Sequence, residues 1–272
     1  MDFLFGGISS ITKGVLSVFA GRHPMFTLVP ISVLAGVVML WAFGRFSNQA
    51  ALRSTKKRLK ASLYELRLFA DDPGLIFRAQ KELLIGNLRY MALMLRPAVI
   101  LTVPMVLLFV QMESFYGLSP LPVGGNGIVT ARMTGGWDMS APAPRLVPPD
   151  GIAVETPAVR VLRDRTLVWR VRASREVSGQ LRLAFAGGQI EKSIDSGAGP
   201  RYVSGRRVSS NASLFWHPAE PRITGAPVEW VEVGYPGSEI EWFGVRLHWL
   251  IWFILISLVG ALLFKGRMKV TF

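Results

Sequence analysis

Three apolar segments divide this chain, at residues 25–44, 97–112 and 247–264. The first carries no charged side chain over its whole length. An α-helix of about 20 apolar residues is long enough to cross the roughly 30 Å hydrocarbon core of a bilayer. Half of all residues in the chain are hydrophobic, which is unusual for a soluble domain of this size. We therefore expect an integral membrane protein with three transmembrane helices.

Basic residues lie where they would set the orientation of these helices. The connector 45–96 carries eleven Lys and Arg against four Asp and Glu, and the tail 265–272 carries three basic residues and no acidic one. Lys and Arg near the ends of spans are retained on the cytoplasmic side. We expect both segments there, the N-terminus and 113–246 on the other side, and the protein in a bacterial inner (plasma) membrane.

The basic charge also bears on partners. Ten of the thirteen net positive charges lie in the connector and the tail, next to the expected membrane surface. Anionic lipid attracts such juxtamembrane basic residues. Membrane lipid is therefore the expected partner of this charge, and no direct binding of nucleic acid is needed to explain it.

The connector 45–96 has the pattern of a cytoplasmic helical hairpin. Leu59 and Leu66 recur at helical spacing among basic residues, and Asp72-Pro73 provides an N-cap followed by a proline suited to the first helical turn. We expect the second helix to continue into the span at 97–112. Leu59 and Leu66 are candidate partner-binding residues, and the alternative is a solvated spacer that touches lipid.

Two further segments are expected to lie outside packed structure. Residues 1–24 carry an apolar stripe at helical spacing that is too short to span a membrane. We expect an interfacial amphipathic helix on the outer membrane face, with a disordered leader as the alternative. Residues 113–149 are rich in proline and glycine, which is typical of an extended linker.

Between 150 and 243 the hydrophobic pattern alternates with a period of two. Three runs have this pattern and are predicted to be strands, with turn residues between them: 166–172, 180–185 and 228–233. We expect an extracytoplasmic β-sandwich with three aromatic residues in its core: Trp169, Phe185 and Trp230. The fold class is thus a membrane protein of the α + β type.

The other faces of these strands carry arginines. Arg170 and Arg182 alternate with the apolar residues and should point away from the core. Guanidinium groups bind carboxylates through two hydrogen bonds, so both are candidate residues for binding an acidic partner. The alternative is a solvated strand face.

No group of residues has the spacing of a catalytic or metal site. The chain has no cysteine and therefore no disulfide or thiolate ligand, and its three histidines are far apart in the sequence. We expect no cofactor, no metal and no enzymatic activity. An envelope enzyme acting on lipid or glycan is a third class that no sequence feature supports.

One part of the chain resembles a known family. Residues 29–113 contain a span that ends at Arg45, a charged helical hairpin, and a second span that begins with Arg96-Pro97-Ala98-Val99-Ile100-Leu101-Thr102-Val103-Pro104. This order resembles the core of YidC-type membrane protein insertases and their three-span archaeal and endoplasmic-reticulum relatives. The resemblance implies a partly hydrophilic groove open to the cytosol, with the hairpin receiving ribosomes or nascent substrates. Arg45, Arg96 and Thr102 are the candidate groove residues.

The chain also departs from that family. Its first span, 25–44, lacks the basic residue that such insertases carry inside the groove, and the β-rich region lies where the family has a short connection. The sequence is therefore compatible with two functions. One is an insertase-like protein that assists insertion or assembly of membrane proteins, with client proteins and ribosomes as partners. The other is a non-catalytic accessory or scaffold subunit that binds the subunits of a larger membrane complex through its outer sandwich.

Overall fold

The structure is a computed structural model that describes residues 14, 22–68, 72–185, 187–268 and 270. The predicted amphipathic helix at 1–24 lies almost entirely outside the described residues. The chain forms two compact units. One comprises 1–27 and 107–249, and the other comprises 28–106 and 250–272.

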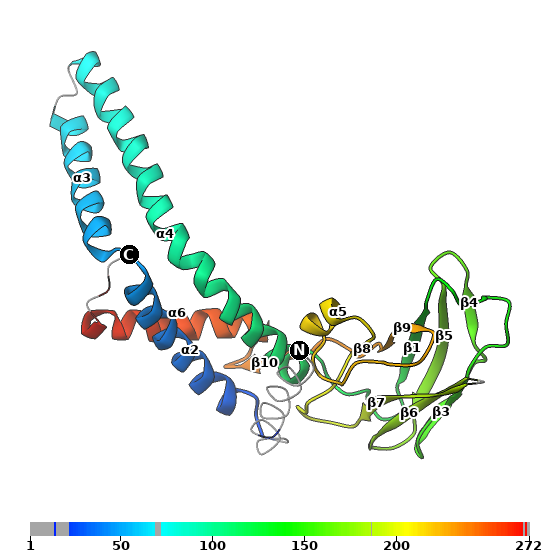
Figure 1. Ribbon diagram of the computed structural model, residues 1–272. Helices are drawn as coiled ribbons and strands as arrows, with labels where there is room; N and C mark the ends of the chain where they lie inside the picture. The colour runs from blue at the N-terminus through cyan, green and yellow to red at the C-terminus, as the bar shows by residue number, and fades with distance from the viewer. Residues whose placement is uncertain (1–13, 15–21, 69–71, 186, 269, 271–272) are drawn as a thin grey trace. The chain divides into compact units, whose positions relative to one another are not determined.

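Long helices account for most of the second unit and continue from it into the first. They are α2 (Met25–Phe46), α3 (Gln49–Leu68), α4 (Pro73–Tyr116) and α6 (Trp249–Met268). In length and apolar composition α2, α4 and α6 can each cross a membrane. The structure therefore agrees with a membrane protein that has three spanning helices and a sheet-rich part. Figure 1 shows α3 running antiparallel beside the first half of α4.

The start and length of α4 follow from local sequence. The Oδ1 atom of Asp72 accepts hydrogen bonds from the backbone nitrogens of Gly74 at 2.8 Å and Leu75 at 3.2 Å, which confirms the predicted N-cap. From there α4 runs without interruption to Tyr116, through Pro97 and Pro104. The predicted continuation of the second hairpin helix into the second span is thus confirmed. Prolines are tolerated in spanning helices when neighbouring groups satisfy the freed carbonyls.

Outside the long helices, the described part of the first unit includes eleven strands and a short helix between residues 117 and 248. The strands are β1 (Asn126–Met133), β2 (Arg145–Val147), β3 (Ile152–Val154), β4 (Val159–Val161), β5 (Thr166–Ala173), β6 (Val177–Phe185), β7 (Gly188–Ser196), β8 (Arg206–Val208), β9 (Val228–Val233), β10 (Glu239–Trp242) and β11 (Val245–His248); the helix is α5 (Asn211–Trp216). One sheet has the order β3-β5-β1-β9-β8 with β4 also paired to β5, a second has the order β2-β6-β7, and β10 pairs with β11. All of these pairings are antiparallel.

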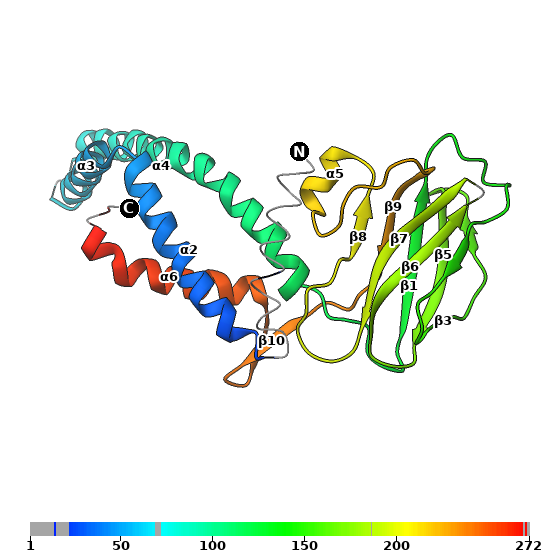
Figure 2. The same ribbon diagram turned by 60° about the horizontal axis from the view of Figure 1, so that its bottom comes forward.

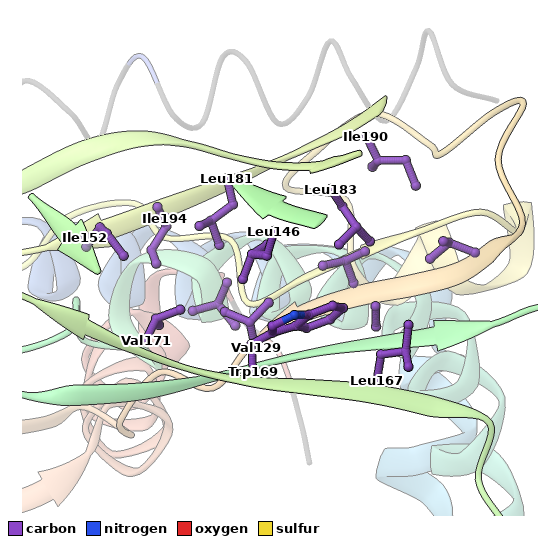
Figure 3. Packing of buried hydrophobic residues seen from close by; sticks show 14 of the residues in the cluster. Val129, Leu146, Ile152, Leu167, Trp169, Val171, Leu181, Leu183, Ile190 and Ile194 are labelled. Atoms are coloured by element: carbon purple, nitrogen blue, oxygen red, sulfur yellow. The ribbon is translucent and has the colours of Figure 1, made fainter. Parts of the chain in front are cut away.

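The two larger sheets face each other across one hydrophobic core (Figure 2 and Figure 3). Trp169 of β5 is 3% exposed and lies between the sheets, with Leu181 and Leu183 of β6 on the opposite side. The period-two pattern of β5 and β6 therefore predicted the inward faces correctly. Phe185 is half-buried and packs at the margin of this core.

The prediction of a linker over 113–149 was wrong. β1 lies inside this range, pairs with both β5 and β9, and buries Val129, Ala131 and Met133 completely. Alternating apolar residues between two Pro/Gly-rich stretches thus form a central strand. The sandwich begins at β1 instead of residue 150.

The placement of Trp230 in the core was also wrong. The register between β1 and β9 shifts at Arg132/Met133. Because a bulge changes which side chains point inward, Val228, Val231 and Val233 are buried, while Trp230 is only half-buried. The Arg206 guanidinium covers the Trp230 ring at 4.4 Å from its centroid.

Candidate functional site

A groove of about 500 Å³ lies among α2, α4 and α6, and all of its lining residues belong to one compact unit. Its lining comprises Ala35, Gly36, Met39, Leu40, Phe43, Met94, Ala98, Leu101, Met105, Phe253, Ile254, Ser257, Leu258 and Ala261. The volume is within the range of typical ligand-binding cavities. Each of the three spanning helices thus contributes to one concave surface.

The floor of this groove depends on a close approach of two helices. A Cβ atom built on Gly36 of α2 would overlap the carbonyl oxygen of Ser257 in α6 and would lie 3.0 Å from its carbonyl carbon. One turn further along α6, a Cβ on Gly260 would lie 3.4 Å from the Cα atom of Val33. Small residues at helix interfaces in membranes allow backbones to come this close. Glycine at position 36 is therefore required by the contact.

The wall from α4 follows a regular spacing. Met94, Ala98, Leu101 and Met105 recur at intervals of four, three and four residues, which places them along one stripe of the helix. This spacing was visible in the sequence but did not stand out, because the whole segment is apolar. The groove residues were therefore missed by sequence reasoning.

The groove is apolar in chemistry. Of the described side chains that line it, none is charged, and the hydroxyl of Ser257 donates its hydrogen bond to the Ile254 carbonyl oxygen at 3.0 Å. Three methionines lie on it: Met39, Met94 and Met105. Methionine is flexible and polarizable, so it adapts to apolar partners of different shape. The surface suits an apolar helix or acyl chain and offers little to a charged segment.

The three candidate groove residues lie elsewhere. Arg45 and Arg96 are exposed, and neither lines this groove. Thr102 is also exposed, and its hydroxyl donates to the Ala98 carbonyl oxygen at 2.9 Å. The partly hydrophilic groove that the family resemblance implied is thus not the groove found here, and any role for these three residues stays a prediction.

The hairpin residues predicted to bind a partner are partly covered. A Cβ on Gly86 of α4 would lie 2.7 Å from Cδ2 of Leu59, so Leu59 packs against α4 inside the hairpin. Leu66 is half-buried. Apolar side chains that the hairpin leaves exposed include Leu63, Leu68, Phe77, Leu84 and Leu88.

The two arginines proposed for binding an acidic partner lie on different sheets. Arg170 of β5 is exposed and contacts Glu155 with 3.2 Å between Nε and Oε2. Arg182 of β6 is exposed and lies 3.7 Å from Glu191. Exposed ion pairs of this kind contribute little to stability, so both guanidinium groups can exchange partners at small cost. The structure does not bring them together into one site.

A buried lysine is the main polar feature that the sequence analysis missed. Lys192 is 2% exposed, and its Nζ atom donates to Glu220 Oε1 at 3.0 Å, to the Ser204 carbonyl oxygen at 2.5 Å and to the Ser193 carbonyl oxygen at 3.1 Å. Burial lowers the pKa of Lys192, and the nearby Glu220 carboxylate opposes that shift. Because all three protons have acceptors, the group ties β7 to the segments around Ser204 and Glu220. A signal was present: period two places Lys192 between Ile190 and Ile194 on the inward face.

Comparison with known proteins leaves the family open. No protein-family model matches the chain, and no curated protein or solved structure matches it either. The groove, the helices that form it and the charge around them therefore carry the functional proposal.

Proposed function

We propose that this protein assists the insertion or assembly of membrane proteins by holding an apolar transmembrane helix of a client in the groove among α2, α4 and α6. The observation that carries the proposal is the lining of that groove, which is apolar except for one internally bonded hydroxyl. A second helix can pack there without leaving a buried polar group unsatisfied. Such a site would shelter a spanning helix until it meets its final partners.

The physical basis is packing. Lipid tails are as apolar as leucine, so helices associate in membranes through close van der Waals contact instead of through the hydrophobic effect. Small residues let a partner backbone approach, and the groove lining includes the alanines Ala35, Ala98 and Ala261. The three methionines allow the same surface to accept helices of different sequence.

The hairpin of α3 and the first part of α4 supports the same proposal. It follows one span, leads directly into another and carries an excess of basic residues. By the rule that basic residues are retained on the cytoplasmic side, we place the hairpin in the cytoplasm and the sandwich outside it. There the hairpin would receive a ribosome or a nascent chain before the client helix enters the groove. A bacterial inner membrane is the setting we propose.

A photo-crosslinking amino acid tests the proposal directly. It is placed at Leu101, which lines the groove, and in a matched variant at Val103, which is exposed on the same helix and does not line it. Illumination of intact cells should give adducts of many sizes with newly made membrane proteins from position 101, and lipid adducts from position 103. An equal pattern from both positions would overturn the proposal.

The second candidate is a fixed accessory or scaffold subunit. The apolar lining favours it as well, because a permanent partner helix needs no hydrophilic path through the membrane. In that case position 101 would give one dominant adduct of constant size, whether or not new proteins are being made. Blocking translation before illumination therefore separates the two: client adducts disappear, and a subunit adduct remains.

A further inference from the structure

The turn of the β10–β11 hairpin has an unusual sequence for its geometry. Trp242 pairs with Val245, so Phe243 and Gly244 form a two-residue turn. Both have positive φ angles, 50° and 78°, as in a type I′ turn. Asn-Gly is the favoured pair in such turns, because a bulky side chain at positive φ is strained. Phenylalanine therefore costs the hairpin stability at a position where asparagine would be better.

The ring of Phe243 gains little from the fold in return. It is 85% exposed, more than any other large hydrophobic side chain among the described residues. It lies against the Trp242 ring, with 4.6 Å between ring centroids. Val245 beside them is 48% exposed. The tip is thus a small apolar surface of three residues, Trp242, Phe243 and Val245, that protrudes from the hairpin.

The ends of the spanning helices fix where this tip lies. Two hydrogen bonds join the ends of these helices to one another, and a third contact joins the hairpin to the residues before α2. The Tyr116 hydroxyl donates to Thr27 Oγ1 at 2.6 Å, and the Trp249 Nε1 atom donates to Glu113 Oε2 at 3.0 Å. His23 Nε2, two residues before α2 begins, lies 3.0 Å from the Glu241 carbonyl oxygen next to the tip.

The hairpin therefore lies next to the first residues of α2 and α6, two helices that are long and apolar enough to cross a membrane. Its last residue, His248, directly precedes the first residue of α6, and Glu241 near its tip contacts His23 just before α2. The ends of spanning helices lie in the interfacial layer of a bilayer, where exposed aromatic side chains are favourable. Trp is enriched in that layer, and Phe serves with Trp as a lipid-facing residue of interfacial segments.

We propose that the Trp242–Phe243 tip inserts into the interfacial layer of the same bilayer that α2, α4 and α6 cross, with lipid as its ligand. The ion pair behind the tip agrees with this position, with 2.7 Å between Arg246 Nε and Glu241 Oε2. Arginine can lay its apolar stem along the lipid and keep its charged end in the headgroup region. The strain at Phe243 is then retained because the ring is needed in the lipid.

A depth measurement tests this. The chain has no cysteine, so a single cysteine can replace Phe243 or, as a control, Leu162. Leu162 is 68% exposed and lies between β4 and β5, at the part of the sandwich away from β10 (Figure 1). Each variant is labelled with an environment-sensitive fluorophore, reconstituted into vesicles of phosphatidylcholine and phosphatidylglycerol, and exposed to lipid carrying a shallow nitroxide.

The label at position 243 should be quenched strongly by the nitroxide lipid and weakly by iodide in the water, with the reverse at position 162. Because the cysteine itself removes the ring, a second pair of variants carries the label at position 245, one with Phe243 retained and one with the substitution Phe243→Asn. Lipid quenching should fall with Phe243→Asn, while thermal stability in detergent is kept or raised.

Equal access of iodide to the labels at positions 243 and 162 would overturn the proposal. So would lipid quenching at position 245 that is the same with Phe243 and with the Phe243→Asn substitution. The tip would then be a free surface for a protein partner.

Discussion

Gly36 and Ser257 bring the backbones of α2 and α6 into direct contact at the floor of the groove. A Cβ at position 36 would overlap the Ser257 carbonyl oxygen and lie 3.0 Å from its carbonyl carbon. Since backbone atoms cannot turn aside as a side chain can, any larger residue must push the two helices apart. The shape of the groove therefore depends on this pair.

Replacing Gly36 with alanine should destabilise the helical unit by about 1–3 kcal/mol, as overpacking does elsewhere. The control is Gly266→Ala in α6, where a Cβ meets nothing within 4 Å. There alanine should be neutral or stabilising by up to about 1 kcal/mol, because it favours helix more than glycine does. Thermal unfolding in detergent compares the two. Equal melting temperatures would mean that the close contact is absent.

A second pair of substitutions tests the register of the sandwich. Trp169→Ala should destabilise the protein by about 3–5 kcal/mol, because it empties a large volume between the sheets. Trp230→Ala should cost clearly less, since the ring is half-buried and contributes mainly its contact with Arg206. Denaturant unfolding of the full chain followed by circular dichroism measures both. A larger loss of stability from Trp230→Ala than from Trp169→Ala would contradict this register and support the sequence-based prediction that Trp230 lies in the core.

Trp169 and Trp230 show when the alternation of apolar residues predicts a buried side chain and when it does not. Strict alternation predicted β5 correctly, because its partners β1 and β3 keep a constant register with it. In β9 the pairing with Arg132 and Met133 skips Glu229, so the inward face changes from Val228 to Val231 and Val233 within the strand, and strict alternation does not reveal such a bulge. β1 was hidden because its flanks have the composition of a linker.

The groove illustrates a different limit. Hydropathy identifies α2, α4 and α6, since each must satisfy its own backbone in lipid. It does not show which side of an apolar helix faces another helix, because core and lipid require the same residue types. The cue to the interface was a small residue, Gly36, and its meaning depends on the position of Ser257 far along the chain.

The buried lysine predicts a dependence of stability on pH. Burial lowers the pKa of Lys192 from its ordinary 10.5. Between the lowered pKa and 10.5, the unfolded chain holds a proton that folded Lys192 has released, so stability should rise with pH in that window. Lys192→Met should abolish the rise. Unfolding midpoints across the alkaline range measure it, and a curve parallel to that of the unmodified protein would contradict the prediction.

Two residues near Lys192 provide controls. Glu220→Gln removes the carboxylate that holds the lysine pKa up, so the rise should begin at lower pH, and the unpaired charge should cost about 3–5 kcal/mol near neutrality. Tyr235 has a pKa raised by burial, so the folded state keeps its proton above 10.0 and stability falls there. Tyr235→Phe should remove this fall of stability above pH 10.0 and leave the rise of stability due to Lys192 at lower pH unchanged.

Orientation can be tested with single cysteines. A sequence-based design would use Ser54 or Ala79 for one side and Ser196 for the other, but Ala79 and Ser196 are buried and would resist reagents on either side. Ser54 is exposed and is kept, and the exposed Leu162 replaces Ser196. In intact cells a membrane-impermeant thiol reagent should label position 162 and spare position 54, because basic hairpins are retained inside. Labelling at 54 alone would invert the proposed topology.

Filling the groove tests the central claim most directly. Ala98→Trp places an indole among the lining residues, whereas Val99→Trp adds the same group to an exposed neighbour on α4. The measurement is insertion of a client with one spanning helix and a short translocated tail into vesicles that contain each variant at equal abundance. Ala98→Trp should reduce insertion severalfold, while Val99→Trp should leave it unchanged. Equal insertion by both variants and the unmodified protein would contradict a client-holding groove.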